Sequence, residues 1–174
     1  LAPKSATAAD GAANADPAAQ IIARDILGDR RDHRHGTGGV QIVAARVTDA
    51  AGKDTFRVLM GETLSFHVLL EAHEEVAAPR AGIRFHDRFN NLVFSAGSFQ
   101  VGCPLPPLEP GQRLVVRFDV TMDVEPGQYT FGLGASEPAA DQPNAGLALD
   151  RIDLLGPVIV GIVRENIRPF YGAA

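Results

Sequence analysis

Apolar and polar residues alternate along the chain from residue 40 onward, which is the pattern of half-buried β-strands. Leu64 and Phe66, for example, are predicted to point to one face of a strand while Ser65 and His67 point to the other. The same two-residue period predicts strands at residues 40–49, 55–59, 63–71, 80–87, 92–96, 113–121, 128–136, 147–154 and 157–164. No helical period of useful length occurs in this region. The predicted fold class is therefore all-β, an antiparallel β-sandwich or jelly roll with two sheets over one core.

Two Pro-Gly pairs, within residues 108–112 and 124–129, each lead directly into an alternating segment. Pro presets φ for the second position of a type II turn and Gly supplies the positive φ of the third, so both pairs are predicted to form such turns. After the second pair, Tyr129 is predicted to point toward the core, and Gly132 and Gly134 toward the opposite face. Glycines inside a strand mark a bulge or a close approach to the backbone, and a bound ligand is one group that approaches in this way.

The first 35 residues are predicted to precede the sandwich. Residues 1–16 are rich in Ala and small polar residues, a composition typical of a linker. Asp16 as N-cap and Pro17 at the first helical position predict a short helix over residues 17–27. The expected organisation is an Ala-rich linker with a possible short helix over residues 1–35, followed by a β-sandwich domain over residues 36–174.

Composition narrows the class of protein. The chain has 174 residues, is 45% apolar and carries a formal net charge of −5, which suits one domain with a proper core. The 16 basic residues are scattered among 21 acidic ones, so no basic stripe for a phosphate backbone is expected, and nucleic acid is not an expected partner. The sequence contains neither an apolar run of about eighteen residues nor an export-signal pattern.

Two smaller observations concern the origin of the chain. A single cysteine, Cys103, cannot form an internal disulfide, which fits a reducing compartment. The sequence begins at Leu1 rather than Met, which suggests a piece of a longer polypeptide.

The outward positions of the predicted strands define a candidate binding face. Alternation assigns polar groups with planar donors and acceptors to the outside of several strands, and side-chain-free positions to the strand after the second Pro-Gly pair. The candidate ligand-binding residues chosen on this basis are His67, Arg84, His86, Arg117, Gly132 and Gly134. A solvated sheet face with no ligand explains the same pattern about equally well. Arginine guanidinium groups beside the glycine positions, where no side chain covers the backbone, favour a site that holds a hydroxyl-bearing ligand flat against the sheet.

Metal and cofactor chemistry is not expected. Blue copper sites need a Cys thiolate, two His and usually an axial Met, but no histidine follows Cys103, and Met122 lies nineteen residues beyond it. Cys103 is instead expected to pack as a small apolar residue. His33 and His35 lie in a charged segment, where solvent exposure is the simpler interpretation.

Catalytic motifs are likewise missing from the sequence. It contains no Gly-x-Ser-x-Gly elbow, no Walker-type phosphate loop and no His-Glu-x-x-His helix. Glu71, Asp87 and Asp119 leave open a carboxylate pair of the kind that hydrolyses glycosides, although any acidic surface supplies such pairs.

Five blocks of sequence, in this order and spacing, resemble one known family. They are GGVQIVAARVTDAAG (38–52), GETLSF (61–66), AGIRFHD (81–87), LEPGQ (108–112) and PGQY (126–129). Together they are similar to the C-terminal domain of Wzt-type ATP-binding proteins of polysaccharide ABC exporters, over residues 36 to about 165. The resemblance implies an immunoglobulin-like β-sandwich that acts as a non-catalytic carbohydrate-binding module. It also implies recognition of the terminal structure of a bacterial O-antigen polysaccharide at the cytoplasmic face of the inner membrane, before export.

The resemblance further implies a homodimer, often with exchanged C-terminal strands, and a membrane transporter subunit reached through an ATPase part that these residues do not include. Sugar sites commonly stack a pyranose ring on Trp or Tyr, but this chain has no Trp and only two Tyr residues. Stacking is therefore expected from Phe89, Phe94 or Phe99, or from Tyr171 of a neighbouring copy.

The last apolar segment adds an independent reason to expect a dimer. Residues 156–164 are mostly apolar or Gly, and an edge strand of this composition is not left facing water. The breaker Gly156-Pro157 would make it a detachable last strand, which can fill the equivalent slot of a second copy. A strand buried within its own chain is the alternative.

Three functions remain open from the sequence. The first is a non-catalytic glycan-binding sandwich, the second is a structural or protein-docking sandwich, and the third is a module of a glycan-modifying enzyme.

Overall fold

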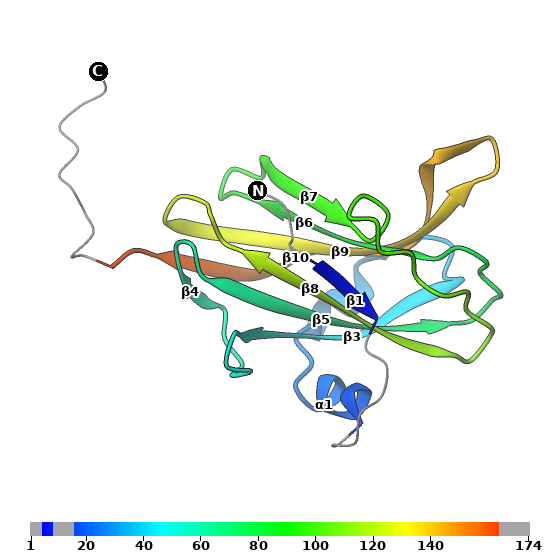
Figure 1. The fold of residues 1–174 in the computed structure, drawn as a ribbon, viewed down its shortest axis with the longest axis horizontal. Helices are drawn as coiled ribbons and strands as arrows, with labels where there is room; N and C mark the ends of the chain where they lie inside the picture. The colour runs from blue at the N-terminus through cyan, green and yellow to red at the C-terminus, as the bar shows by residue number, and fades with distance from the viewer. Residues whose placement is uncertain (1–4, 9–15, 164–174) are drawn as a thin grey trace.

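The computed structural model describes residues 5–8 and 16–163, which form a β-sandwich with one short α-helix (Figure 1). Its elements are β1 (Ser5–Ala8), α1 (Pro17–Ala23), the 3-10 helix η1 (Gly28–Asp32), β2 (Arg34–His35), β3 (Val40–Asp49), β4 (Arg57–Leu59), β5 (Thr63–Ala72), β6 (Arg80–His86), β7 (Leu92–Gly97), β8 (Arg113–Thr121), β9 (Gly127–Ala139) and β10 (Gln142–Gly161). The predicted all-β, antiparallel fold class is confirmed.

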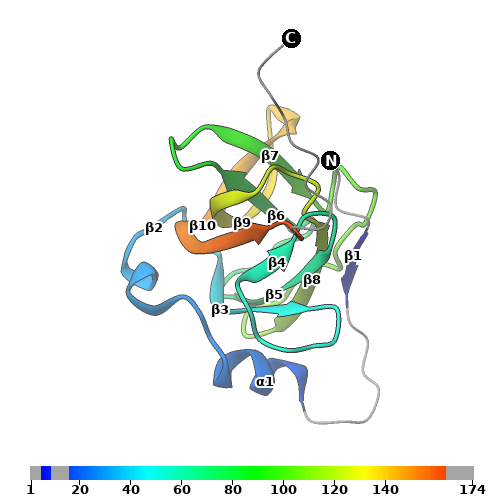
Figure 2. The same ribbon diagram turned by 90° about the vertical axis from the view of Figure 1, so that its left-hand side faces the viewer.

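The described strands form two sheets that face each other. A four-stranded sheet has the order β1-β8-β5-β3, and a six-stranded sheet has the order β2-β10-β9-β6-β7 with β4 beside β10. All these pairs are antiparallel except β4 with β10. Figure 2 shows the six-stranded sheet above the four-stranded one, with α1 beneath the latter.

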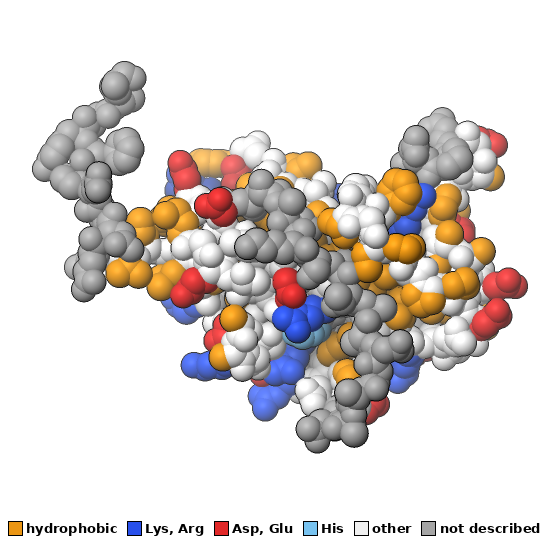
Figure 3. Space-filling model, in the orientation of Figure 1, with side chains coloured by type: hydrophobic (Ala, Val, Ile, Leu, Met, Phe, Trp, Pro, Cys, Tyr) orange, Lys and Arg blue, Asp and Glu red, His pale blue; other side chains and the backbone are white. Residues whose placement is uncertain are grey.

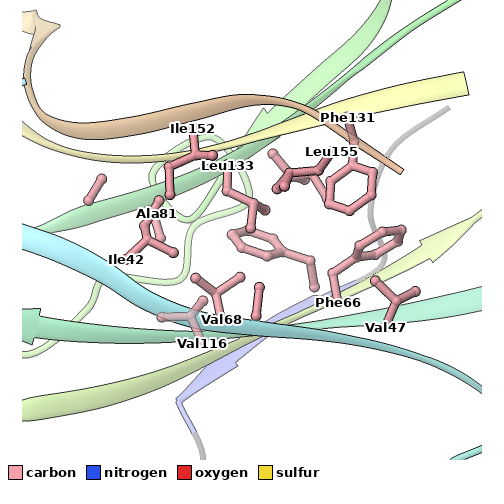
Figure 4. Packing of buried hydrophobic residues seen from close by; sticks show 14 of the residues in the cluster. Ile42, Val47, Phe66, Val68, Ala81, Val116, Phe131, Leu133, Ile152 and Leu155 are labelled. Carbon is pink, nitrogen blue, oxygen red and sulfur yellow. The ribbon is translucent and has the colours of Figure 1, made fainter. Parts of the chain in front are cut away.

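Alternation places one apolar face of each sheet in the shared core, as the sequence pattern requires. Phe66 of the four-stranded sheet meets Phe131 and Phe85 of the six-stranded sheet edge-on, with ring centroids 5.0 and 5.4 Å apart. Figure 4 shows Val68 and Val116 facing Leu133 across the same interior. Tyr129 is buried as predicted, and its hydroxyl donates to the carbonyl of Glu125.

A smaller apolar cluster lies on the outside of the four-stranded sheet. Ile21 of α1 packs there against Ala44 and Leu69, with Val115 at its margin. The helix thus covers apolar residues of β3 and β5 that would otherwise face water on the outer side of the four-stranded sheet. Its predicted start is confirmed, because the Asp16 side chain accepts a hydrogen bond from the Ala18 amide.

The N-terminal region departs from the expected linker. The helix ends at Ala23 rather than near residue 27, because the Ile26 amide donates to the Ala45 carbonyl and draws the chain onto the edge of β3. Leu27 is buried in the main core. Earlier in the chain, β1 pairs with β8, whose backbone groups would otherwise form an open sheet edge.

The open edge of β3 is covered by side chains and loop backbone rather than by another full strand. The Asp25 carboxylate accepts from the Ala45 amide, and an Arg31 guanidinium nitrogen donates to the Val43 carbonyl. Farther along, the carboxylate of Asp150 on β10 accepts from the Ile42 amide at 2.7 Å. The segment before β3 is therefore part of the packed domain.

Asp150 also pairs with Arg34 of β2, whose Nη1 lies 3.3 Å from Oδ2. The Asp150 side chain is 2% exposed, and burial raises its pKa, opposed by the Ile42 amide and the Arg34 charge. One buried carboxylate thus joins the edge of the four-stranded sheet to β10 of the other sheet.

The two Pro-Gly pairs differ. Gly111 has φ +84° and the Gln112 amide donates to the Glu109 carbonyl, so the first turn is confirmed. The prediction for Gly127 was wrong, because this residue starts β9 without a positive φ and lies opposite Val160 in the ladder. Ladder pairing with β10 fixes an extended conformation there.

The predicted break at Gly156-Pro157 was also wrong. β10 continues through it as one strand, with register shifts between Ile152 and Leu155 and between Leu155 and Val158 that absorb the irregular backbone. Val158 and Val160 are buried, and residues 159–160 lie between β9 and β4 of the same chain. Residues 164–174, including Tyr171, lie outside the described residues.

We predict that Asp150→Ala lowers the free energy of unfolding by about 3 kcal/mol, because it removes one partner of a buried ion pair and leaves the Ile42 amide without an acceptor. Asp150→Asn keeps an acceptor oxygen and removes the buried charge, so its loss at pH 7 is smaller, about 1 kcal/mol. Urea unfolding followed by circular dichroism measures both.

We also predict that the difference in unfolding free energy between the unsubstituted protein and Asp150→Asn depends on pH. The unfolded Asp carboxyl titrates near about 3.9, below the raised pKa of folded Asp150, so the folded protein binds more protons between these values. The stability that this group contributes therefore falls as the pH rises from about 4 through the folded pKa. Relative to Asp150→Asn, the unsubstituted protein should lose stability over that interval, and a constant difference contradicts the assignment.

Candidate functional site

Three glycines lie side by side across adjacent strands on the outer face of the six-stranded sheet. Gly82 of β6 is paired with Gly97 of β7 on one side and with Gly134 of β9 on the other, and Gly134 is paired with Arg151 of β10. We call Gly97, Gly82 and Gly134 the glycine row. At Gly82 and Gly134 no side chain covers the backbone, which therefore forms the floor of the sheet face there. Gly97 is covered by the Gln100 side chain, because an added Cβ would lie 2.6 Å from its Oε1.

The glycine row is the floor of a groove with a volume of about 450 Å³. One side carries Arg80 and Ser136, and the other carries Arg84 and Ser95. The remaining lining comes from residues of β6, β7 and β9 that flank the glycine row and from residues of β10 within 146–151, together with Leu92 and Gln100. The β9–β10 hairpin rises on this outer side of the sheet in Figure 1, and Ser136 and Gly146 near its base line the groove.

Alternation along β10 brings Arg151 to the groove. Asp150 and Ile152 are buried, whereas the Arg151 and Asp153 side chains are 39% and 29% exposed on the outer face. Arg151 and Arg84 both approach Asp153, with Nε of Arg151 2.7 Å from Oδ2 and Nε of Arg84 3.8 Å from Oδ1. Burial lowers the pKa of the Arg84 guanidinium, as does the charge of Arg151, and Asp153 opposes both effects.

The ion pairs are close but poorly aligned. Arg151 Nε and Asp153 Oδ1 are out of contact with water, and neither makes a hydrogen bond with a described residue, although Arg151 Nε is within ion-pair distance of Oδ2. Arg80 has a different neighbour, since its guanidinium lies 4.0 Å from the ring centre of Phe99. The guanidinium groups of Arg80, Arg84 and Arg151 thus bring hydrogen-bond donors to the groove.

The structure divides the residues predicted for one binding face between two opposite faces. Arg84, His86, Gly132 and Gly134 lie on the six-stranded sheet, and His67 and Arg117 lie on the four-stranded sheet. The expectation of a single face was wrong, because alternation tells inside from outside but not which sheet a strand joins.

On the six-stranded sheet the predicted residues have different surroundings. Arg84 and Gly134 line the groove, whereas His86 lies opposite Thr130, outside it. Gly132 is not bare, because the side chains of Arg84 and Asp153 cover it, and a Cβ at this position would collide with Asp153 Oδ1. At Gly134 the nearest atom to an added Cβ is the Asp150 carbonyl oxygen at 3.8 Å.

On the four-stranded sheet His67 and Arg117 face each other and line a smaller pocket of about 260 Å³ beside α1. His67 shares a hydrogen bond with Thr48 Oγ1, and burial, followed by the charges of Arg117 and Arg46, lowers its pKa. Arg117 pairs with Asp119 and donates to Ser65 Oγ. His67 and Arg117 are therefore each held by a neighbour on the four-stranded sheet.

Several groove residues were not singled out from the sequence, namely Arg80, Gly82, Ser95, Gly97, Ser136 and Arg151, and neither was Asp153 beside the groove. Alternation in residues 147–154 could have placed Arg151 and Asp153 on the outside. The glycine row needs the strand register, which the sequence pattern does not contain.

Among the aromatic candidates for stacking, Phe89 and Phe99 are exposed, with 69% and 51% of their surface accessible. Phe94 instead stacks on Phe85 of the core, with ring centroids 4.7 Å apart. Phe99 lies beside the groove through its contact with Arg80.

Within residues 5–8 and 16–163, no group of three His, Cys, Asp or Glu side chains is arranged to hold a metal ion. Cys103 packs partly buried against the core. None of the helices in that part of the chain is long and apolar enough to cross a membrane. On the face displayed in Figure 3, basic and acidic side chains lie among each other rather than in one basic area.

Comparison with known proteins agrees with this architecture. The family model described as the Wzt C-terminal domain matches residues 31–167. A solved structure described as the C-terminal domain of wzt matches with a TM-score of 0.67 and 17% identity, over 79% of this chain and 87% of that chain. A CARDB domain of the PF1109 protein from Pyrococcus furiosus, solved in complex with di-metal ions, has a TM-score of 0.42 and 12% identity, over 73% of this chain and 93% of that chain. No curated protein matches the chain.

We predict opposite effects of alanine at the two neighbouring glycines of β9. Gly134→Ala should leave the free energy of unfolding unchanged or raise it by up to about 1 kcal/mol, because the methyl group fits and the unfolded chain loses freedom. Gly132→Ala should lower it by about 1 kcal/mol, because Asp153 and Arg84 must move. Thermal unfolding of both variants measures this, and equal effects contradict the described packing.

Proposed function

Because the chain belongs to the Wzt C-terminal domain family, we propose that it is a non-catalytic glycan-binding module of a bacterial polysaccharide export system, with the groove over the glycine row as its site. The observation that carries the proposal is this groove of about 450 Å³ with a backbone floor and guanidinium groups at its sides.

The physical chemistry of the groove suits a sugar. A pyranose ring in its chair form is thin, with two broad faces and hydroxyl groups around its edge, so it needs an approach to the sheet that side chains do not block. Gly82 and Gly134 of the glycine row provide that approach across two adjacent strands. Arg80, Arg84 and Arg151 present donors beside it, and Ser95 and Ser136 add hydroxyl groups that both donate and accept.

The rest of the proposal follows from family membership. The module would recognise the terminal structure of an O-antigen polysaccharide at the cytoplasmic face of the inner membrane. It would act beside an ATPase part and a membrane transporter subunit. A binding module of this kind needs neither a metal nor another cofactor.

Protein docking is the second candidate function, and one observation favours it. β7 is the last strand of the six-stranded sheet in the described residues, and Leu92 and Val93 on it are 58% and 39% exposed. An edge strand with exposed apolar side chains is a surface on which a protein partner can add a strand.

Two arginine variants on opposite sheets test the proposed site. We predict that Arg84→Ala weakens binding of the surface polysaccharide of the source organism by about tenfold, because it removes charge-assisted donors from the groove. Arg117→Ala is the matched control, since Arg117 lies on the other sheet and pairs with Asp119. Calorimetric titration should give a dissociation constant in the millimolar to micromolar range, about −4 to −8 kcal/mol, for the unsubstituted domain.

Each other outcome of this titration has a defined meaning. Weakening by Arg117→Ala alone moves the site to the four-stranded sheet. Binding of a protein partner without any binding of glycan favours docking. Shortening of the glycan during the titration, seen by mass spectrometry, favours a glycan-modifying enzyme.

The proposal includes a homodimer in which residues 157–164 exchange between copies. Within one chain, residues 159–160 pair with β9 on one side and β4 on the other, and the equivalent two strands of a second copy offer the same contacts. We predict twice the monomer mass by light scattering at micromolar concentration. A monomeric mass under these conditions contradicts the dimer without affecting the proposed groove.

A further inference from the structure

We propose that the groove over the glycine row binds a negatively charged sugar, whose carboxylate or phosphate group is held between Arg84 and Arg151. The inference rests on the proposed function, because it names the class of glycan that the groove accepts. It is argued from the charges, the unused donors and the shape of the groove.

The charge of the groove is opposite to that of the whole chain. Arg80, Arg84 and Arg151 line it, and the one acidic lining residue, Asp150, turns its carboxylate inward to the Ile42 amide and Arg34. Asp153, beside the groove, is the carboxylate that pairs with Arg84 and Arg151. These two positive charges thus share one negative charge in a chain whose formal net charge is −5. Such a local excess attracts anions.

The donors of two of these arginines are largely unused. Arg84 and Arg151 each approach Asp153 through Nε, and no described residue accepts a hydrogen bond from their Nη nitrogens. A guanidinium carries five N–H donors in a rigid fork that matches the geometry of carboxylate and phosphate oxygens. One misaligned carboxylate therefore leaves most of this donor capacity to a ligand.

The shape of the groove explains why the anion would be attached to a sugar. Arg84 follows Gly82 by two residues on β6 and is paired with Gly132 of β9. Arg151 lies at the end of the glycine row, where it is paired with Gly134. The backbone floor between and beyond them has room for a ring, since an added Cβ at Gly134 or Gly82 would meet no atom closer than 3.4 Å. A charged substituent between the arginines would place its ring on this floor.

Four probes separate the anion from the sugar. They are methyl glucoside, glucuronic acid, glucose 6-phosphate and inorganic phosphate, each followed by nuclear magnetic resonance shifts of the backbone amides of Gly82 and Gly134. We expect glucuronic acid or glucose 6-phosphate to bind at least about tenfold tighter than methyl glucoside, and to weaken with added salt. The relative affinity of these two sugars identifies whether the groove prefers carboxylate or phosphate.

Substitutions then test the named residues. Arg151→Gln should weaken the charged sugar by about tenfold and change methyl glucoside by less than about twofold. Asp153→Asn keeps an acceptor oxygen for Arg151 but removes the nearby negative charge, so it should tighten the charged sugar by about two- to fivefold. Arg113→Gln, which lies on the four-stranded sheet beside Glu71, changes net charge equally and is the control.

The outcomes distinguish the inference from the proposed function. Equal affinity for methyl glucoside and the charged sugars overturns the anion while the glycan groove stands. Inorganic phosphate binding as tightly as glucose 6-phosphate, with no binding of methyl glucoside, supports the anion site and contradicts the glycan groove. Weakening by Asp153→Asn, or equal weakening by Arg113→Gln and Arg151→Gln, overturns the assignment to this arginine pair.

Discussion

The buried carboxylate of Asp150 is the interaction on which the arrangement of the two sheets and the groove depends. It accepts the Ile42 amide on the edge of the four-stranded sheet and pairs with Arg34 on the edge of the six-stranded sheet. A buried charge is stable only with such partners, so this contact fixes how β10 lies against β3. The next residue of the alternating strand, Arg151, must then point outward to the groove.

The groove itself depends on register rather than on any one residue. Gly82 and Gly134 form an open floor only because β6 and β9 align them as partners. The same alignment places Gly97 of β7, which the Gln100 side chain covers, at one end of the row. A shift of one residue in β9 would place a core residue such as Leu133 or Ala135 in the row. The same register brings Arg84 next to Gly132, where its side chain covers a glycine that would otherwise extend the floor.

Much of the fold could be predicted from alternation, and little of the site. The bounds of β3 and β8 agree with the predicted strands 40–49 and 113–121, because their inward residues are uniformly apolar. Alternation also placed His67 and Arg84 correctly on outward faces, but the two lie on different sheets, and sheet membership comes from long-range pairing. Gly156-Pro157 looked like a strand end, yet the register shifts of β10 accommodate it. Residues 16–35 looked like a linker because the partners of Asp25 and Arg34 are distant in the sequence.

The central claim is that the outer face of the six-stranded sheet holds the glycan. A crystal structure of the domain with an end fragment of the exported polysaccharide tests this most directly. The account predicts a sugar ring over Gly82 and Gly134, with Arg84 and Arg151 within hydrogen-bond distance of its polar atoms. A fragment bound instead beside His67 and Arg117 on the four-stranded sheet would contradict it.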